Sequence, residues 1–419
     1  MGGKRGTVGG RVVARRRVFH IPGYDPFPPR RYRELYRREA AEQARVSGWE
    51  VALSRRGPDG WRVRAVVEGR AVEATFEVLA WGDIVRGSME AGNAATYGQL
   101  ARTAWTYAAS GALWRLAGLR KGPVLAALYP VAVLLGQLAL ALGLGALAGR
   151  GALAGLGAAG VDAAGWGWAL RVVVLAGVAA GMLRWFKRHD GRVLAHYLMH
   201  DFAFSARWGG ANPPALEDRM AEWKGRIAAA LASDADEVLV VGHSSGAHLA
   251  VSVLADLVRA GQVPDREATR RPALGLLSLG QAIPMVSFLP EARRLRADLA
   301  LLAAQGEVAW VDVTAPGDGA SFALCDPVAV SGVRPPGARW PLVISAAFSR
   351  TLSPERWRAL RWRFFRCHFQ YLCAFDRPGD FDYFRITAGP RTLWDRFAGR
   401  APSRQAITRA ASPHVSTAA

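Results

Sequence analysis

Cysteine is scarce in this chain of 419 residues, with only Cys325, Cys367 and Cys373. Three cysteines cannot build a disulfide scaffold, and none of them forms a pair at metal-ligand spacing. We therefore expect free thiols in a reducing compartment and no metal site. A glycine-rich phosphate loop following a strand is also missing, so we expect no nucleotide or other cofactor.

Lysine is rare as well, so arginine carries most of the formal charge of +20. No zinc-finger spacing, basic zipper or RNA-stacking signature accompanies this charge, and we expect no nucleic-acid partner. An excess of positive charge still favours anionic partners. Because the chain also carries apolar segments long enough for a bilayer, anionic lipid headgroups are the expected partner. The sequence sets no oligomeric state.

Charged residues are absent from residues 123–149, a stretch longer than the roughly 20 helical residues that cross a bilayer core. Residues 166–185 form a second apolar segment, in which Arg171 and Arg184 lie near the ends and can reach the interface. The alternative is a pair of buried core helices, although such helices rarely run so long without a polar face. We expect a hairpin of two membrane spans.

The flanks of the two spans predict the orientation of this hairpin. Positive residues lie before the first span and after the second: Arg115, Arg120, Lys121, Lys187, Arg188 and Arg192. Residues 1–17 are basic but lack the apolar core of a signal peptide. By the positive-inside rule both flanks are cytoplasmic, which suits the inner (cytoplasmic) membrane. Glycines four apart, at 145 and 149 and at 177 and 181, would permit close helix packing.

The most informative motif is Gly242-His243-Ser244-Ser245-Gly246. It follows the apolar run 238–241, typical of a buried parallel strand, and precedes residues 247–257, which have helical periodicity. Strand, sharp turn and helix in this order predict a nucleophile elbow, in which small residues let strand and helix pass closely. Ser244 is therefore the candidate nucleophile.

The rest of the chain alternates predicted strands and helices. Strands are expected at residues 16–20, 49–53, 61–67, 71–81, 274–279, 307–314 and 341–347, and helices at 32–44, 216–231 and 291–304. Alternating strands and helices predict an α/β fold with a mostly parallel sheet and flanking helices. The membrane hairpin is then an insertion into one sheet-based domain.

We divide the chain accordingly into five parts. These are a flexible basic N-terminus (1–10), the first part of the domain (11–115), the transmembrane hairpin (116–190), the second part with the elbow (191–400) and a flexible tail (401–419).

With these features the chain resembles the α/β-hydrolase superfamily of lipases, esterases and related serine hydrolases. The resemblance rests on the elbow motif, on the strand ending His20-Ile21-Pro22-Gly23-Tyr24, and on the order of candidate partners downstream. It implies an acid and then a histidine after the serine. Only the elbow motif is specific.

Three histidines follow Ser244. His248 would point along the helix after the elbow, and His414 lies in the tail, so His368 is the candidate general base. The alternative is that residues 357–372 form one apolar helical stripe, on which His368 is a core residue.

Two aspartates are candidates for the acid that orients the histidine. Asp318 lies in the turn after the strand 307–314, where the superfamily carries its acid. Asp326 stands before Pro327-Val328, a context like that of some lipases, and Asp312 lies within the strand itself. Each aspartate could instead only cap a turn.

An oxyanion hole needs two N–H donors. We expect the Ser245 N–H to supply one, and by the resemblance Tyr24 or Gly23 to supply the other.

These residues together predict a membrane-anchored serine hydrolase that cleaves a carboxylic ester or thioester, including one in a small molecule or a lipid, through an acyl-enzyme on Ser244. An acyltransferase would use the same acyl-enzyme. A non-catalytic membrane protein that uses the fold as a binding or assembly platform is the other alternative.

Overall fold

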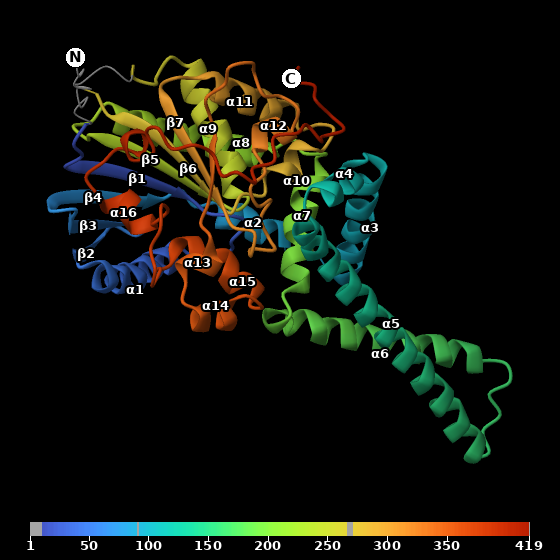
Figure 1. The fold of residues 1–419 in the computed structure, drawn as a ribbon. Coiled ribbons are helices and arrows are strands. Elements are labelled where there is room, and N and C mark those ends of the chain that lie inside the picture. The colour runs from blue at the N-terminus through green and yellow to red at the C-terminus, as the bar shows by residue number, and fades with distance from the viewer. Residues whose placement is uncertain (1–10, 90–91, 266–270, 419) are drawn as a thin grey trace, which may run out of the picture.

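The computed structural model describes residues 11–89, 92–265 and 271–418. Within them, one sheet of eight strands forms the centre of the domain (Figure 1). The strands are β1 (Arg15–Ile21), β2 (Glu50–Arg56), β3 (Gly60–Val67), β4 (Arg70–Val78), β5 (Glu237–His243), β6 (Ala273–Leu279), β7 (Val308–Thr314) and β8 (Leu342–Ser345).

Helices cover the sheet, and two of them extend away from it. The helices before the elbow are α1 (Arg30–Ser47), α2 (Gly82–Met89), α3 (Asn93–Ala109), α4 (Ala112–Leu119), α5 (Lys121–Ala158), α6 (Gly167–Arg188), η1 (Asp190–Arg192), α7 (Ala195–Arg207) and α8 (Pro214–Leu231). Those after it are α9 (Gly246–Arg259), α10 (Ile283–Ser287), α11 (Arg293–Ala304), α12 (Pro327–Val330), α13 (Phe348–Thr351), α14 (Pro354–Leu360), α15 (Phe364–His368), η2 (Phe369–Leu372), α16 (Tyr383–Ala388) and α17 (Leu393–Arg396).

The sheet has the order β2-β3-β4-β1-β5-β6-β7-β8. Only β3 runs antiparallel to its neighbours, and every other adjacent pair is parallel. The prediction of an α/β protein with a mostly parallel sheet and flanking helices is confirmed. Parallel strands end at the same edge of a sheet, so the turns after β1, β5, β6 and β7 lie together.

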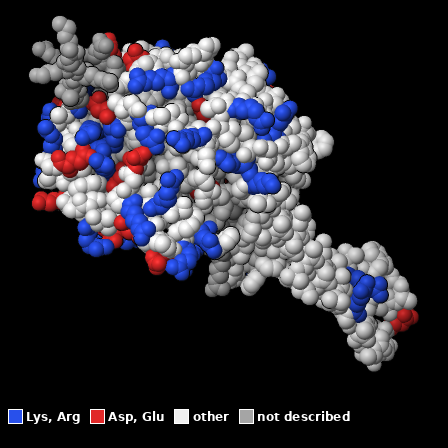
Figure 2. Space-filling model, in the orientation of Figure 1, with Lys and Arg blue, Asp and Glu red and all other residues white. Residues whose placement is uncertain are grey.

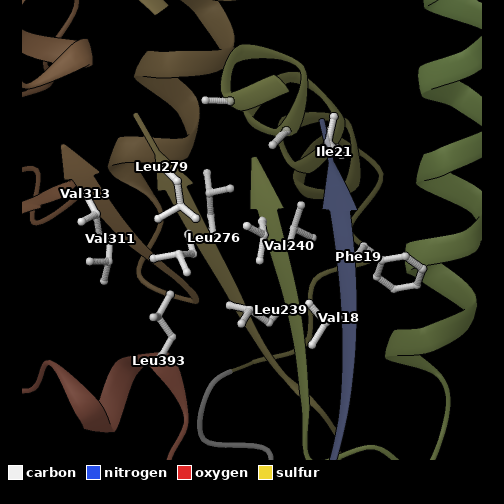
Figure 3. Packing of buried hydrophobic residues seen from close by; sticks show 14 of the residues in the cluster. Val18, Phe19, Ile21, Leu239, Val240, Leu276, Leu279, Val311, Val313 and Leu393 are labelled. Carbon is white, nitrogen blue, oxygen red and sulfur yellow. The ribbon is translucent and has the colours of Figure 1, made fainter. Parts of the chain in front are cut away.

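The central strands form the core because both faces are covered by helices. Every residue of β5 is buried, as is every residue of β7. Figure 3 shows the side chains of Val18 and Leu239, which are register partners, packed side by side on one face of β1 and β5. This apolar packing fixes β5, and therefore the turn that follows it.

Helices α5 and α6 form an antiparallel hairpin that projects from the domain (Figure 1). Both are long and apolar enough to cross a membrane, and only 17% and 6% of their most apolar windows are buried. A core helix would be mostly buried, so the core-helix alternative does not describe them. Figure 2 shows the hairpin almost free of charge between its base and its far end.

One of the two glycine pairs lies where the helices of the hairpin touch. A Cβ on Gly145 would stand 2.9 Å from the Leu175 carbonyl oxygen, and one on Gly149 would stand 3.2 Å from that of Arg171. Close packing therefore depends on these two glycines. Gly177 and Gly181 have open space beside them, so the expectation for the second pair was wrong.

The first turns of α5 pack on the domain. Val124 is buried with Leu116 and Phe322, and Leu134 is buried with Met199 of α7. The apolar run that starts at residue 123 therefore has two parts: its first turns join the domain core, and the remainder is exposed except where it packs on α6. The number of apolar residues in the sequence could not distinguish the part of α5 that packs on the domain from the part that extends away from it.

Two further expectations need correction. Helices α2, α3, α4 and α7 were not predicted, because their apolar residues are interrupted by glycine and polar positions. The tail was expected to be flexible from residue 401, yet as far as Ser416 it makes hydrogen bonds to the domain. The Arg296 Nε donates to the Ser416 carbonyl (2.7 Å), and the Asp326 N–H donates to that of Ile407 (2.9 Å). The expected flexible N-terminus, residues 1–10, lies outside the described residues.

Candidate active site

Ser244 stands at the sharp turn between β5 and α9. Its φ of 57° is left-handed, a conformation that is uncommon for a residue with a side chain. The strain of such a residue is of the order of 1–3 kcal/mol and persists only where neighbours impose it. Here the Ser244 N–H donates to the Leu279 carbonyl (2.9 Å), which fixes the turn against the end of β6.

Glycines surround this turn because backbone passes on every side. A Cβ on Gly246 would lie 2.3 Å from the Ile21 carbonyl oxygen and 2.4 Å from that of Pro22. One on Gly242 would lie 2.7 Å from the Ala247 Cα, and one on Gly23 would lie 2.9 Å from the Ser244 Cβ. The spacing of the motif is thus explained by contact between the elbow and the loop after β1.

Gly246→Ala is expected to destabilise the protein by about 3 kcal/mol, because the new methyl group would meet rigid backbone rather than a flexible side chain. Gly225→Ala is the control, since Gly225 lies inside α8 with open space beside it and should gain about 0.5–1 kcal/mol. Urea unfolding of the detergent-solubilised protein measures both. Equal midpoints for Gly246→Ala and the unmodified protein would contradict the close approach.

His368 and Asp318 lie together at the same edge of the sheet. The Nδ1 of His368 is 2.9 Å from the Asp318 Oδ2. That carboxylate also accepts from the Tyr371 hydroxyl (3.0 Å) and, through Oδ1, from the Ala320 N–H (3.0 Å). Burial acts to raise the pKa of Asp318, but the His368 charge and these hydrogen bonds together lower it below its usual value. Asp318 is therefore ionised at neutral pH.

This pairing sets the proton of the imidazole. With Nδ1–H donating to Asp318, the neutral ring leaves Nε2 as an unprotonated acceptor. The Nε2 is buried and has no hydrogen-bond partner within the described residues. The Nε2 of His243 contacts the His368 carbonyl (3.0 Å), and the two rings stand 4.8 Å apart. His243 thus ties the backbone of His368 to the strand that carries Ser244.

Ser244 and His368 line one narrow cavity of about 80 Å³. Its walls are largely aromatic, and they come from the loop after β1, from α7, from α15 and η2, and from the first turns of α5. The lining residues include Tyr24, Tyr197, Asp201, Phe365, Phe369, Pro123 and Ala126. Ser244 and His368 therefore line the same partly open cavity.

His368 is not on one long helical stripe. It is the last residue of the five-residue α15, which is separated from α14 by Arg361-Trp362-Arg363 and is followed by η2. The superfamily resemblance implied a loop, and the structure places His368 at the end of a very short helix instead.

The other candidate residues lie away from this cavity. Asp326 caps α12, where its Oδ1 accepts from the N–H groups of Val328 and Ala329, and its other oxygen pairs with Arg334. Asp312 accepts from the Ser278 hydroxyl (2.5 Å). His248 is buried within α9, and His414 contacts the Ser110 carbonyl (3.2 Å). The structure thus brings together Ser244, His368 and Asp318, and it leaves Asp326 in a capping position.

The expected oxyanion hole needs one correction. The Tyr24 N–H donates to the Ser245 Oγ (2.8 Å), so it is not free for an incoming oxyanion. Within the described residues the N–H groups of Ser245 and Gly23 donate to no acceptor. These two groups lie beside Ser244, and the Tyr24 hydrogen bond holds the Gly23 loop against the elbow.

Three residues around the site were missed from the sequence. His243 occupies the variable position of the motif, Tyr371 lies three residues after His368, and Asp201 lies on a helix that was not predicted. The position of His243 directly before Ser244 was a usable signal. For Asp201 there was none, because its approach to the elbow depends on how α7 packs.

A comparison with known protein families, curated proteins and solved structures finds no match for this chain. In the described ranges, no group of three or more histidine, cysteine, aspartate or glutamate residues could hold a metal ion.

Proposed function

We propose that this protein is a membrane-anchored serine hydrolase that cleaves a carboxylic ester or thioester through an acyl-enzyme on Ser244. One observation carries the proposal: His368 contacts Asp318 through one ring nitrogen, its other ring nitrogen has no hydrogen-bond partner among the described residues, and His368 lines the same cavity as Ser244. Serine becomes nucleophilic at neutral pH only beside such a base.

In the first step the Ser244 Oγ attacks the carbonyl carbon of the ester, and the His368 Nε2 takes the hydroxyl proton. The imidazolium that forms is stabilised by the ionised Asp318. The negative charge moves to the carbonyl oxygen, where the N–H groups of Ser245 and Gly23 would receive it. Each such donor contributes roughly 3–4 kcal/mol to the stability of the transition state.

Collapse of this intermediate breaks the bond to the leaving alcohol or thiol, which receives the proton from His368. An acyl-enzyme on Ser244 remains. Water then attacks the acyl carbon while His368 takes a proton from it, and the same steps in reverse release the acid and free Ser244.

The membrane part of the proposal rests on the hairpin and on the surface beside it. Pro123 and Ala126 of α5 line the cavity, so the helix that would enter the bilayer begins at the site. This position favours esters of lipids as substrates, alongside small esters.

In the linker between α14 and α15, the exposed fraction of Trp362 is 83%, and the arginines on either side of it are also exposed. Figure 2 shows basic side chains over this region. Arginine and tryptophan together suit an interface with anionic headgroups. The positive flanks place the domain on the cytoplasmic side of the inner membrane in this proposal.

Labelling with a fluorophosphonate probe tests the proposal. We expect the unmodified protein to react, and Ser244→Ala to lose the label completely because the nucleophile is gone. Ser54→Ala, which removes an exposed hydroxyl from the edge strand β2, should label like the unmodified protein. Labelling that is indifferent to Ser244 would leave a non-catalytic platform as the better description, and product analysis with an added acyl acceptor would reveal acyl transfer.

A further inference from the structure

Asp201 is a carboxylate in the candidate active site for which the proposed reaction has no use. It lies on α7, which stands between the sheet and the base of α5 (Figure 1), and it lines the cavity with Ser244 and His368. Within the described part of the chain it receives no hydrogen bond and forms no ion pair.

Asp25, the second carboxylate in the cavity wall, has a structural role. Asp25 accepts from the Phe27 N–H (2.9 Å) and from the Tyr32 hydroxyl (2.6 Å), and the Arg31 guanidinium lies 3.7 Å away. Both of its oxygens are thus engaged. Asp201 lines the same cavity, but among the described residues it has no hydrogen-bond donor and no basic partner. Its oxygens therefore stay available to a ligand.

No lysine or arginine lines this cavity, although the chain carries 54 such residues against 34 acidic ones. The cavity wall is therefore acidic inside a strongly basic protein. An enclosed carboxylate without a counter-ion attracts a cation strongly, because few water molecules screen it. Burial raises the pKa of Asp201 to about 7, which the charge of His368 partly opposes.

Aromatic rings complete the environment. Tyr197 lies one helical turn before Asp201, and its ring centroid is 6.0 Å from those of Tyr24 and Phe365. Phe369 lies in the same wall. Faces of aromatic rings attract cations, and substituted ammonium groups, which carry their charge on an apolar surface, bind best among several such rings.

We propose that Asp201, with the surrounding aromatic rings, is the recognition site for a substituted ammonium group on the ester substrate. This inference rests on the proposed function in that the ester bond would lie at Ser244 while the ammonium group lies at Asp201. An anionic group at the same position would be rejected, because two negative charges would share a space without a compensating cation.

Binding measurements on the full-length Ser244→Ala protein in detergent test this without requiring catalysis. The probes are the butyrate ester of choline and its uncharged carbon isostere, dimethylbutyl butyrate, compared by isothermal titration calorimetry. We expect the charged ester to bind about 10-fold to 100-fold more tightly. Asp201→Asn in the same background should abolish this preference while the affinity for the uncharged ester stays within about twofold.

Glu355→Gln is the matched control, because it removes one negative charge from the exposed surface of α14 and should leave the preference unchanged. Equal affinities of the two esters for the Ser244→Ala protein would overturn the inference whether or not Asp201→Asn folds. A preference that survives in a folded Asp201→Asn protein would overturn it as well. If the preference depends on Asp201 while the unmodified protein cleaves neither ester, the recognition site stands and the proposed hydrolysis fails.

Discussion

His368→Ala is expected to lower kcat for ester hydrolysis by about 10⁶-fold, because His368 lines the cavity with Ser244 and pairs with the acid Asp318, and is the proposed base that takes the proton of Ser244. The loss should appear in kcat rather than in KM, since the imidazole acts on the transition state and the aromatic walls of the cavity remain. Initial rates with a small chromogenic ester, at enzyme concentrations high enough to see the residual activity, measure it.

His414→Ala is the matched control. That histidine contacts the Ser110 carbonyl in the C-terminal segment, away from the cavity, and its loss should leave kcat within about twofold. A His368→Ala protein that keeps more than one tenth of the activity would show that another group deprotonates the nucleophile.

Asp318→Asn is expected to lower kcat by about 10⁴-fold with little change in structure. An asparagine amide facing Nδ1 favours the tautomer that carries its proton on Nε2, and Nε2 then cannot accept the proton of Ser244.

Asp326→Asn distinguishes between the two aspartates that the sequence left as candidates for the acid. It weakens the cap of α12 and the pair with Arg334, so stability should fall while kcat changes by less than about tenfold.

Acid stability gives a second measurement for Asp318. Because its pKa is lower in the folded protein than in the unfolded chain, its contribution to stability is present above the unfolded pKa and is lost as pH falls through the folded value. The unmodified protein should therefore lose stability toward acid pH more steeply than Asp318→Asn. Parallel pH curves, or a kcat effect larger for Asp326→Asn, would contradict the assignment.

The elbow could be predicted from the sequence because every local feature agrees there. The motif combines an all-apolar strand, two glycines around the serine and a helical stripe, and few other structures are compatible with these three features. The contacts of Gly242 and Gly246 explain why small residues are needed on both sides of the serine. The strands that follow were also found, since buried parallel strands are short continuous apolar runs.

The sequence could not predict which aspartate is the acid, or which residues surround the site. Asp318 and Asp326 both follow β7, and only the packing of His368 decides which aspartate it meets. Asp201 and Tyr197 reach the cavity because α7 packs on α5 and bonds to the loop after β1, which are segments far apart in the chain. The tail was misjudged because its composition resembles a linker while its backbone bonds to the domain.

The place of β1 in the sheet also bears on how the protein is made. In the sheet β1 lies between β4 and β5. In the sequence, however, the two apolar helices α5 and α6 come before β5, so they are synthesised first. One side of β1 therefore stays unpaired while α5 and α6 are being synthesised. We expect the nascent N-terminal half to need a chaperone at that open edge until the serine-bearing strand arrives and closes it.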